Sequence, residues 1–251
     1  MFEDRERFWE VDLIRGIALL MMITYHLIYD LYYFGNYGID ANSGVWLILG
    51  RSTAILFITI VGVSLSLSYA RVKDDLSTNE ILIKYVKRGG FIFSLGLLIT
   101  IATYLFLKGE GYVRFGILHL IGVAVVLSVP LLRYKYVNLV GAGVVIVTGF
   151  YLADLSFSFN WLLWLGFRPE GFHTVDYFPI LPWFGLVLLG IFIGKLLYPE
   201  YSRMIKIPDL SRKKPIRFVS FIGQNTLIFY LVHQPILISV LYLMGLIDLP
   251  L

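Results

Sequence analysis

The sequence predicts an all-α fold: a polytopic membrane bundle of about seven transmembrane helices. Of its 251 residues, 58% are hydrophobic and 15% are charged, whereas a soluble domain carries about 25% charged residues. The apolar residues fall into repeated runs of about 18 residues or more, the length that crosses a bilayer as a helix. No linker rich in Gly, Pro or Ser separates these runs, so we expect one integral membrane domain over residues 1–251.

Turn-rich or charged segments divide the apolar sequence into seven expected spans. These spans are residues 11–34, 45–69, 89–107, 115–132, 137–153, 179–198 and 218–247. The loop GNYGIDANSG (35–44) ends the first span, and the charged connection 70–88 separates the second from the third. Pro179 and Pro182 suit the start of the sixth helix, with Asp176 before them as its N-cap.

Two segments are less regular. The loop 154–178 contains WLLWLGF, which is too short to cross a bilayer and is expected to lie in the interface, where Trp is favoured. The last span is long, and polar residues interrupt it at Gly223, Gln224 and Asn225 and again at 233–235.

The lysines and arginines orient the bundle. With seven spans, all 21 except Arg51, Lys108, Arg114 and Arg168 fall at one set of helix ends. Because basic residues favour the cytoplasmic side, the N-terminus is predicted to be cytoplasmic and the C-terminus external. The net charge of +4 is assigned to topology and to contact with anionic membrane lipids, and no nucleic acid partner is expected. The predicted location is the cell membrane, as a multi-pass protein.

The first span carries the main clue to function, a set of ionisable residues inside an apolar helix. Asp12, Arg15, His26 and Asp30 cost a few kcal/mol each in a bilayer, so such residues usually face a protein interior or a watery cavity. At about 100° per residue they fall, with Leu19, within roughly a third of the helix circumference. One polar stripe is therefore predicted along this helix.

Histidines are the strongest candidates for chemistry, because imidazole transfers protons near neutral pH. His26, His119 and His233 lie inside expected spans and are predicted to converge at mid to outer depth, while His173 lies in the external loop 154–178. The structural alternative is that each histidine only hydrogen-bonds a neighbouring helix. For three intramembrane histidines together, that alternative is less favoured.

Other polar residues have two interpretations each. Asp12 and Arg15 form either an ion pair, with the arginine reaching the interface, or a site for an anionic group of a cofactor or lipid. Asp176 and Trp183 form either a helix start or the entrance of a sugar site. Asn225, Tyr230 and His233 make a second polar stripe, whose amide is either interhelical glue or a substrate contact.

Several classes of site are not indicated. The sequence has no Gly-rich phosphate loop, no HExxH and no nucleophile elbow. It has no cysteine, which excludes disulfides, thiolate metal sites and a cysteine nucleophile. Neither a metal nor a permanently bound cofactor is expected.

The order of its motifs resembles one family along about 240 residues. The start VDLIRGIALLMMITYH carries a D-x-x-R-G-x-A core at Asp12, Arg15, Gly16 and Ala18. The further likenesses are FITIVGVSLSLS (57–68), RFGILHLIGVA (114–124), DYFPILPWFGLVLLGIFIGK (176–195) and QNTLIFYLVHQPI (224–236). Together they resemble the catalytic domain of the heparan-α-glucosaminide N-acetyltransferase family and, more distantly, membrane acyltransferases that modify surface polysaccharides.

The resemblance implies transfer of an acetyl group from cytoplasmic acetyl-CoA, a co-substrate, to a sugar or amino sugar of a cell-surface glycan or glycolipid. It also implies a histidine as general base or as acetylated intermediate. His173 is the nearest local match to the family's active histidine, although the loop around it differs, and His26 and His119 are rivals. The expected partners are membrane lipids, the sugar or glycolipid acceptor and, in a homodimer, a second copy of the chain.

The residues then take roles in an acyltransferase. Arg15, Lys87 and Arg88 make a basic cytoplasmic rim for CoA, and the thioester arm enters along the polar stripe. Asp30, one turn beyond His26, orients that imidazole as the third member of a triad does. The alternatives are a flippase or permease for a lipid-linked sugar, whose path the same polar groups would line, and a purely structural subunit.

Overall fold

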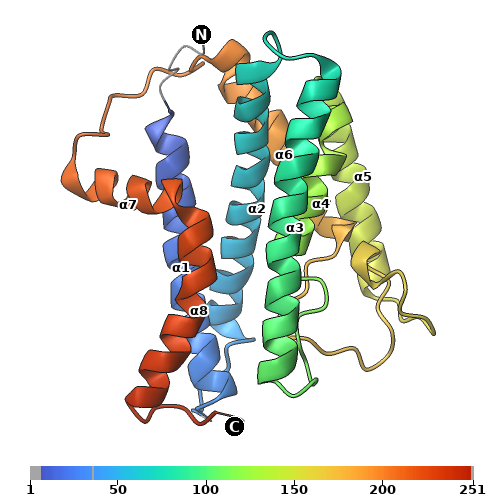
Figure 1. The fold of residues 1–251 in the computed structure, drawn as a ribbon, viewed down its shortest axis with the longest axis vertical. Coiled ribbons are helices and arrows are strands. Elements are labelled where there is room, and N and C mark those ends of the chain that lie inside the picture. The colour runs from blue at the N-terminus through green and yellow to red at the C-terminus, as the bar shows by residue number, and fades with distance from the viewer. Residues whose placement is uncertain (1–6, 36, 250–251) are drawn as a thin grey trace. The chain divides into compact units, whose positions relative to one another are not determined.

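The computed structural model describes residues 7–35 and 37–249, so the two ends of the predicted domain lie outside the described residues. Their regular structure is helical. The elements are α1 (Trp9–Tyr33), α2 (Gly44–Val72), α3 (Thr78–Phe106), α4 (Ile117–Leu127), η1 (Val129–Leu131), α5 (Tyr136–Ala153), η2 (Leu163–Leu165), α6 (Ile180–Leu197), η3 (Pro199–Tyr201), α7 (Lys214–Gln224) and α8 (Thr226–Leu243) (Figure 1). Six of them, α1, α2, α3, α5, α6 and α8, are long and apolar enough to cross a membrane. The polytopic helical membrane bundle is confirmed.

The chain divides into two compact units. The first comprises Met1–Ile60 with Lys206–Leu251, and the second comprises Val61–Ile205. The division falls inside α2, which contributes its first part to one unit and its last part to the other. The single domain over residues 1–251 stays a prediction.

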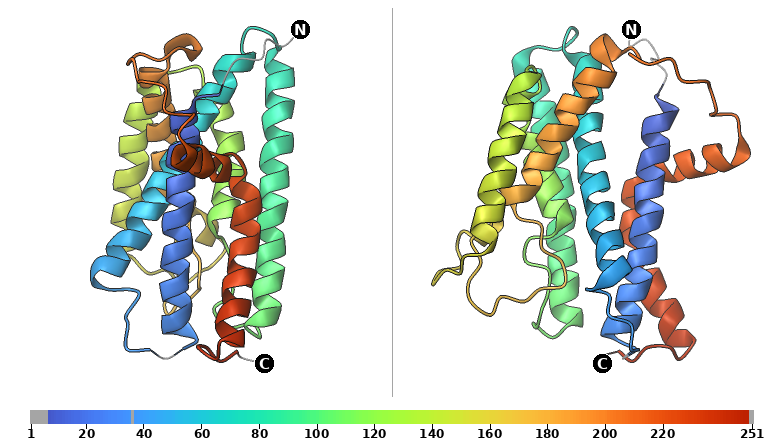
Figure 2. Two further views of the ribbon diagram at one scale, coloured as in Figure 1. Left: turned by 90° about the vertical axis from the view of Figure 1, so that its left-hand side faces the viewer. Right: turned by 180° about the vertical axis from the view of Figure 1, so that it is seen from behind.

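In the first unit α1 and α8 run in the same direction. The backbone N–H of Asp248, just beyond α8, donates to the Phe34 carbonyl at the end of α1, at 3.2 Å. At the other end, Arg15 of α1 donates to the carbonyl of Gly223, just before α8, at 3.2 Å. Figure 2 shows α8 beside the later part of α1. Two spans that cross in the same direction require an odd number of crossings between them.

The parallel pair gives the short helix α4 a place in the topology. Between α1 and α8 lie α2, α3, α5 and α6, four candidate spans, and the 11-residue α4. With η1, α4 reaches about 22 Å, less than the roughly 30 Å of a bilayer core. An odd number of crossings therefore needs α4 as the fifth, which favours the predicted seven spans.

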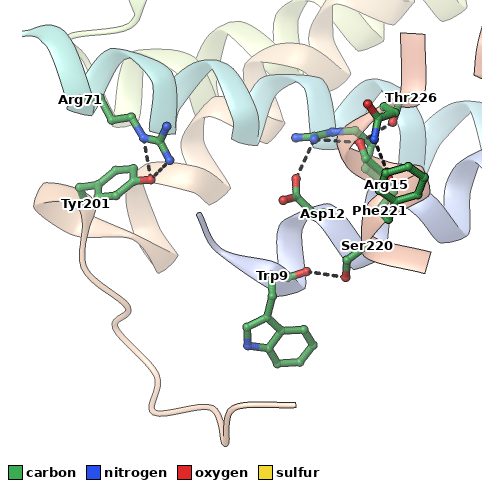
Figure 3. Close-up of polar contacts among 10 residues, drawn as sticks. Trp9, Asp12, Arg15, Arg71, Tyr201, Ser220, Phe221 and Thr226 are labelled. Carbon is green, nitrogen blue, oxygen red and sulfur yellow. Dashed lines mark hydrogen bonds and ion pairs between the residues drawn. The ribbon is translucent and has the colours of Figure 1, made fainter. Parts of the chain in front are cut away.

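The helix α7 crosses α1 at very close range because of two glycines. A Cβ on Gly16 would overlap the carbonyl of Val219, and a Cβ on Gly223 would overlap the carbonyl of Asp12. Ser220, on the same inner face of α7, is buried and its hydroxyl donates to the Trp9 carbonyl at 3.4 Å (Figure 3). The glycine of the D-x-x-R-G core is therefore needed for helix packing.

In the second unit the helices pair as α3 with α4 and α5 with α6. Glycines again permit close approach: Gly89 of α3 faces the Gly122 carbonyl of α4, and Gly149 of α5 faces Pro182 of α6. At the end of α2, the Arg71 guanidinium donates to the hydroxyl of Tyr201 in η3 (Figure 3).

Three sequence-based boundaries are wrong. The connection 70–88 is helical from Thr78, because Ser77 and Glu80 form a capping box that starts α3 eleven residues before the predicted span. The predicted span 218–247 is two helices, which meet at Asn225. Asp176 does not cap the sixth span, since α6 begins after Pro179 without a side-chain cap.

The crossing of α1 and α7 predicts that Gly16→Ala destabilises the protein, by about 1–3 kcal/mol, because a methyl group has no room beside Val219. Gly143→Ala on α5 is the matched control, since no described atom outside its own stretch of helix lies within 4 Å of the added Cβ. There the better helix propensity of Ala should leave the thermal midpoint equal or slightly higher. Thermal unfolding in detergent measures both, and equal midpoints for the two variants would contradict this packing.

Candidate functional site

The first polar centre of α1 is the Asp12–Arg15 pair. The Arg15 guanidinium donates to Asp12 Oδ1 at 2.9 Å and to the Gly223 carbonyl at 3.2 Å (Figure 3). Gly223 also accepts from the Thr226 hydroxyl at 2.6 Å. Asp12 is 5% exposed and its Oδ2 has no hydrogen-bond partner in the part of the chain that the structure describes, whereas the Arg15 side chain is 23% exposed. The pair therefore joins α1 to the α7–α8 junction and leaves the arginine accessible at its edge.

The second polar centre lies further along the same face of α1. The rings of His26 and His233 have centroids 5.1 Å apart. Asp30 is fully buried, and its Oδ1 accepts from Gln234 Nε2 at 2.6 Å. The predicted contact between Asp30 and His26 is wrong. Asp30 accepts a hydrogen bond from Gln234 instead, and His26 Nδ1 has no partner among the described residues.

This centre holds four buried polar atoms that no described residue satisfies. They are His26 Nδ1, Asp30 Oδ2, His233 Nε2 and Gln234 Oε1. A buried polar atom without a partner costs about 1–3 kcal/mol, and more in an apolar layer. Four such atoms in two adjacent helices indicate a site that receives water or a polar ligand.

The tautomer of His233 follows from its hydrogen bond. Its Nδ1 lies 2.6 Å from the Tyr230 carbonyl, which can only accept, so Nδ1 carries the proton. In the neutral ring Nε2 then has a lone pair available, and this buried atom has no partner within residues 7–35 and 37–249. His233 therefore presents a base or nucleophile to the centre, held by a backbone carbonyl where serine proteases use an aspartate.

An apolar section separates the two centres. Leu19 and Met22 of α1 pack with Ile222 of α7 in a buried cluster, flanked by Phe229 and Tyr230. The stripe predicted along α1 does face α7 and α8, but it is polar only at its two ends. The prediction of a continuous polar stripe from Arg15 to His26 is therefore wrong.

His119 belongs to the second unit and is 2% exposed. Its Nδ1 accepts from the backbone N–H of Gly116 at 3.2 Å, and its Nε2 lies 3.4 Å from the Thr100 hydroxyl. Both nitrogens are engaged, so the ring closes the first turn of α4 against α3. This geometry favours the structural interpretation of His119, and its convergence with the other histidines stays a prediction.

Asp176 also holds the start of α4. Its Oδ2 accepts from the Ile117 backbone N–H at 3.2 Å. The neighbouring backbone fixes it there, since the Phe178 N–H donates to the Phe115 carbonyl at 2.9 Å. Burial raises the pKa of Asp176 from 3.8 to about 6, partly opposed by the Ile117 N–H. Trp183 is half-buried, and the centroid of its ring lies 4.7 Å from that of Phe178.

Four predicted site residues make none of the hydrogen bonds of the two centres described above. His173 is exposed in the loop before α6, and Lys87 and Arg88 are exposed on α3, all in the second unit. Asn225 ends α7, and its side-chain amide donates to the Phe221 carbonyl at 2.9 Å. This bond gives Asn225 a structural role at the junction of α7 and α8.

The fold and these centres define a multi-pass helical membrane protein with histidines and carboxylates buried in its spans. The family described as "Heparan-alpha-glucosaminide N-acetyltransferase, catalytic" matches residues 7–235, and the chain belongs to this family of membrane N-acetyltransferases. The resemblance stated from the sequence is confirmed. No curated protein and no solved structure matches the chain.

Sequence reasoning did not assign Gln234, although it is the partner of Asp30. A signal was present, because a glutamine beside a histidine within an apolar span needs a hydrogen-bond partner on another helix. The partner itself depends on how α8 lies against α1, which spacing within one helix cannot give.

Asp176 predicts a pH effect on stability. Because the folded protein raises its pKa, folding is favoured most when the carboxyl is protonated, and stability falls as pH rises from about 4 to about 6. Asp176→Asn should remove this fall while keeping an oxygen for the Ile117 N–H. Asp176→Ala loses that acceptor as well and should be about 1 kcal/mol less stable than the Asn variant at every pH. Thermal midpoints across this range measure both effects, and an unchanged pH profile in Asp176→Asn contradicts the burial of the charge.

Proposed function

We propose that the protein transfers an acetyl group from cytoplasmic acetyl-CoA to a sugar or amino sugar of a cell-surface glycan or glycolipid in the cell membrane. Membership of the N-acetyltransferase family supports the reaction class. The observation that carries the proposal is the pair of histidines. Each ring has one buried nitrogen without a partner among the described residues, as does Asp30 Oδ2 beside them. Acyl transfer needs such a base.

The donor end of the proposal is the Asp12–Arg15 pair. CoA is anionic, and the arginine is both partly exposed and held in place by Asp12 and by the Gly223 carbonyl. A guanidinium fixed in this way suits a phosphate group. From Arg15 to His26 the helix rises about 16 Å, so a long thin arm must bridge the two centres. Lys87 and Arg88 belong to the second unit, and their part in binding CoA stays a prediction.

The acceptor end is the second polar centre. His233 Nε2 takes a proton from the attacking amine or hydroxyl as the new bond to the acetyl carbon forms. The carbon–sulfur bond breaks at the same time, and CoA leaves as the thiolate, which then takes up a proton. The Tyr230 carbonyl steadies the imidazolium through Nδ1. His26, 5.1 Å away ring to ring, lies close enough to share this role.

The apolar section between the centres weighs against the flippase or permease alternative. Buried Leu19, Met22 and Ile222 fill the face of α1 between Arg15 and His26. A sugar needs a path lined by hydrogen-bonding groups, because desolvating its hydroxyls in an apolar layer is costly. A thin arm with few charges crosses such a section more easily.

The test of this function is transfer from radiolabelled acetyl-CoA to a panel of amino sugars by the purified protein. His233→Ala should lower the rate by about 10²–10⁴-fold, as the loss of a general base does. Val232→Ala, a change at an exposed neighbour on α8, is the matched control and should keep the rate. Transfer that persists in His233→Ala would move the reaction to another histidine, and absence of transfer in the parent would overturn the function.

The donor end gives a separate prediction. Arg15→Ala should raise the KM for acetyl-CoA about 10- to 100-fold, which is the value of a hydrogen bond to a charged group. Arg15→Lys keeps the charge but lacks the planar guanidinium, so its KM for acetyl-CoA should lie between those of the parent and of Arg15→Ala. An unchanged KM in Arg15→Ala, with the thermal midpoint preserved, would place CoA elsewhere.

A further inference from the structure

The outer face of α7 carries an unusual stripe. Lys214, Arg217, Phe218 and Phe221 stand at i, i+3, i+4 and i+7, which places them on one side of the helix. All four are exposed, Phe218 at 64% and Phe221 at 54%. The opposite side holds the buried Ser220, Ile222 and Gly223 against α1. The described residues thus cover α7 on the side that faces α1 and leave the other side exposed.

The position of α7 relates it to the membrane-spanning helices of the first unit. It lies across α1 and leads directly into α8 (Figures 1 and 2). The 18 residues of α8 span about 27 Å, close to the roughly 30 Å of a bilayer core. If α8 fills the hydrocarbon core, its start lies at the boundary between hydrocarbon and headgroups, and α7 then lies along that boundary.

We propose that the outer face of α7 is a docking surface for anionic phospholipids of the bilayer. Phe218 and Phe221 insert among the acyl chains, while Lys214 and Arg217 bind headgroup phosphates beside them. Arg212 and Lys213, also exposed, extend the positive charge immediately before the helix. Interleaved aromatic and basic residues are the pattern of helices that lie in a membrane interface.

The same chemistry fits lipid better than CoA. Both carry phosphate, but only a lipid supplies acyl chains for two exposed phenylalanines. Docking on lipid also has a structural consequence, because the last residues of α7 supply the Gly223 carbonyl that binds Arg15. The bilayer thus holds the outer face of α7, while Gly16 and Gly223 allow its inner face to pack closely on α1.

The chain has no cysteine, so a single introduced cysteine can be labelled cleanly. Phe218→Cys carries an environment-sensitive fluorophore, and the protein is reconstituted in phosphatidylcholine vesicles with or without phosphatidylglycerol. Bromine atoms are placed on the acyl chains of one lipid at a time. The proposal predicts stronger quenching by brominated phosphatidylglycerol than by the same fraction of brominated phosphatidylcholine. Equal quenching by the two lipids overturns it.

Charge variants in this labelled background test the source of the preference. Lys214→Gln with Arg217→Gln should lower the relative affinity for phosphatidylglycerol about fivefold for each residue removed. Lys84→Gln with Arg133→Gln removes the same charge from exposed positions elsewhere and should keep the preference. Loss of the preference in the control, its persistence in the α7 variant, or its release by free CoA contradicts the proposal. No acetyl transfer is measured, so the outcome is independent of the proposed function.

Discussion

The cost of placing ionisable side chains inside an apolar helix governs the first unit. Asp12, Arg15, His26 and Asp30 would each destabilise α1 if it faced lipid alone. Hydrogen bonds offset this cost near both ends of the helix. Arg15 donates to the Gly223 carbonyl, and Asp30 accepts from the Gln234 amide. These two bonds hold α7 and α8 against α1 and explain why segments far apart in the sequence pack together.

The D-x-x-R-G core can be understood residue by residue from this packing. Asp12 and Arg15 are one helical turn apart and form the ion pair, and Arg15 reaches the start of α8. Gly16 follows because the Val219 carbonyl of α7 occupies the space where a Cβ would stand. Ala18 is fully buried on the same helix. The core thus combines an ion pair that reaches the start of α8 with the close helix crossing that positions it.

The sequence predicted the helical membrane class and the face of α1 that packs inward, and the ion pair of Asp12 with Arg15 was one of its two interpretations. Each depends on composition or on spacing within one helix. The partners of Asp30 and Asp176 could not be predicted in this way, because Gln234 and Ile117 lie on other helices. The apolar residues Leu19 and Met22 between the polar centres are visible in the sequence of α1, but their packing on Ile222 of α7 could not be predicted from spacing within one helix. The break at Asn225 was visible as a polar interruption, but its consequence, a separate helix α7, depends on the contact with α1.

The two polar centres stand at opposite ends of the α1 face that packs on α7 and α8, and they suit a reaction whose donor and acceptor arrive from opposite sides of a membrane. The most direct measurement uses sealed vesicles that contain the purified protein and a trapped amino sugar, with radiolabelled acetyl-CoA added only outside. If transfer crosses the membrane, the trapped sugar becomes labelled while both compounds stay in their compartments. Label that appears only when donor and acceptor share one compartment would contradict transfer across the membrane.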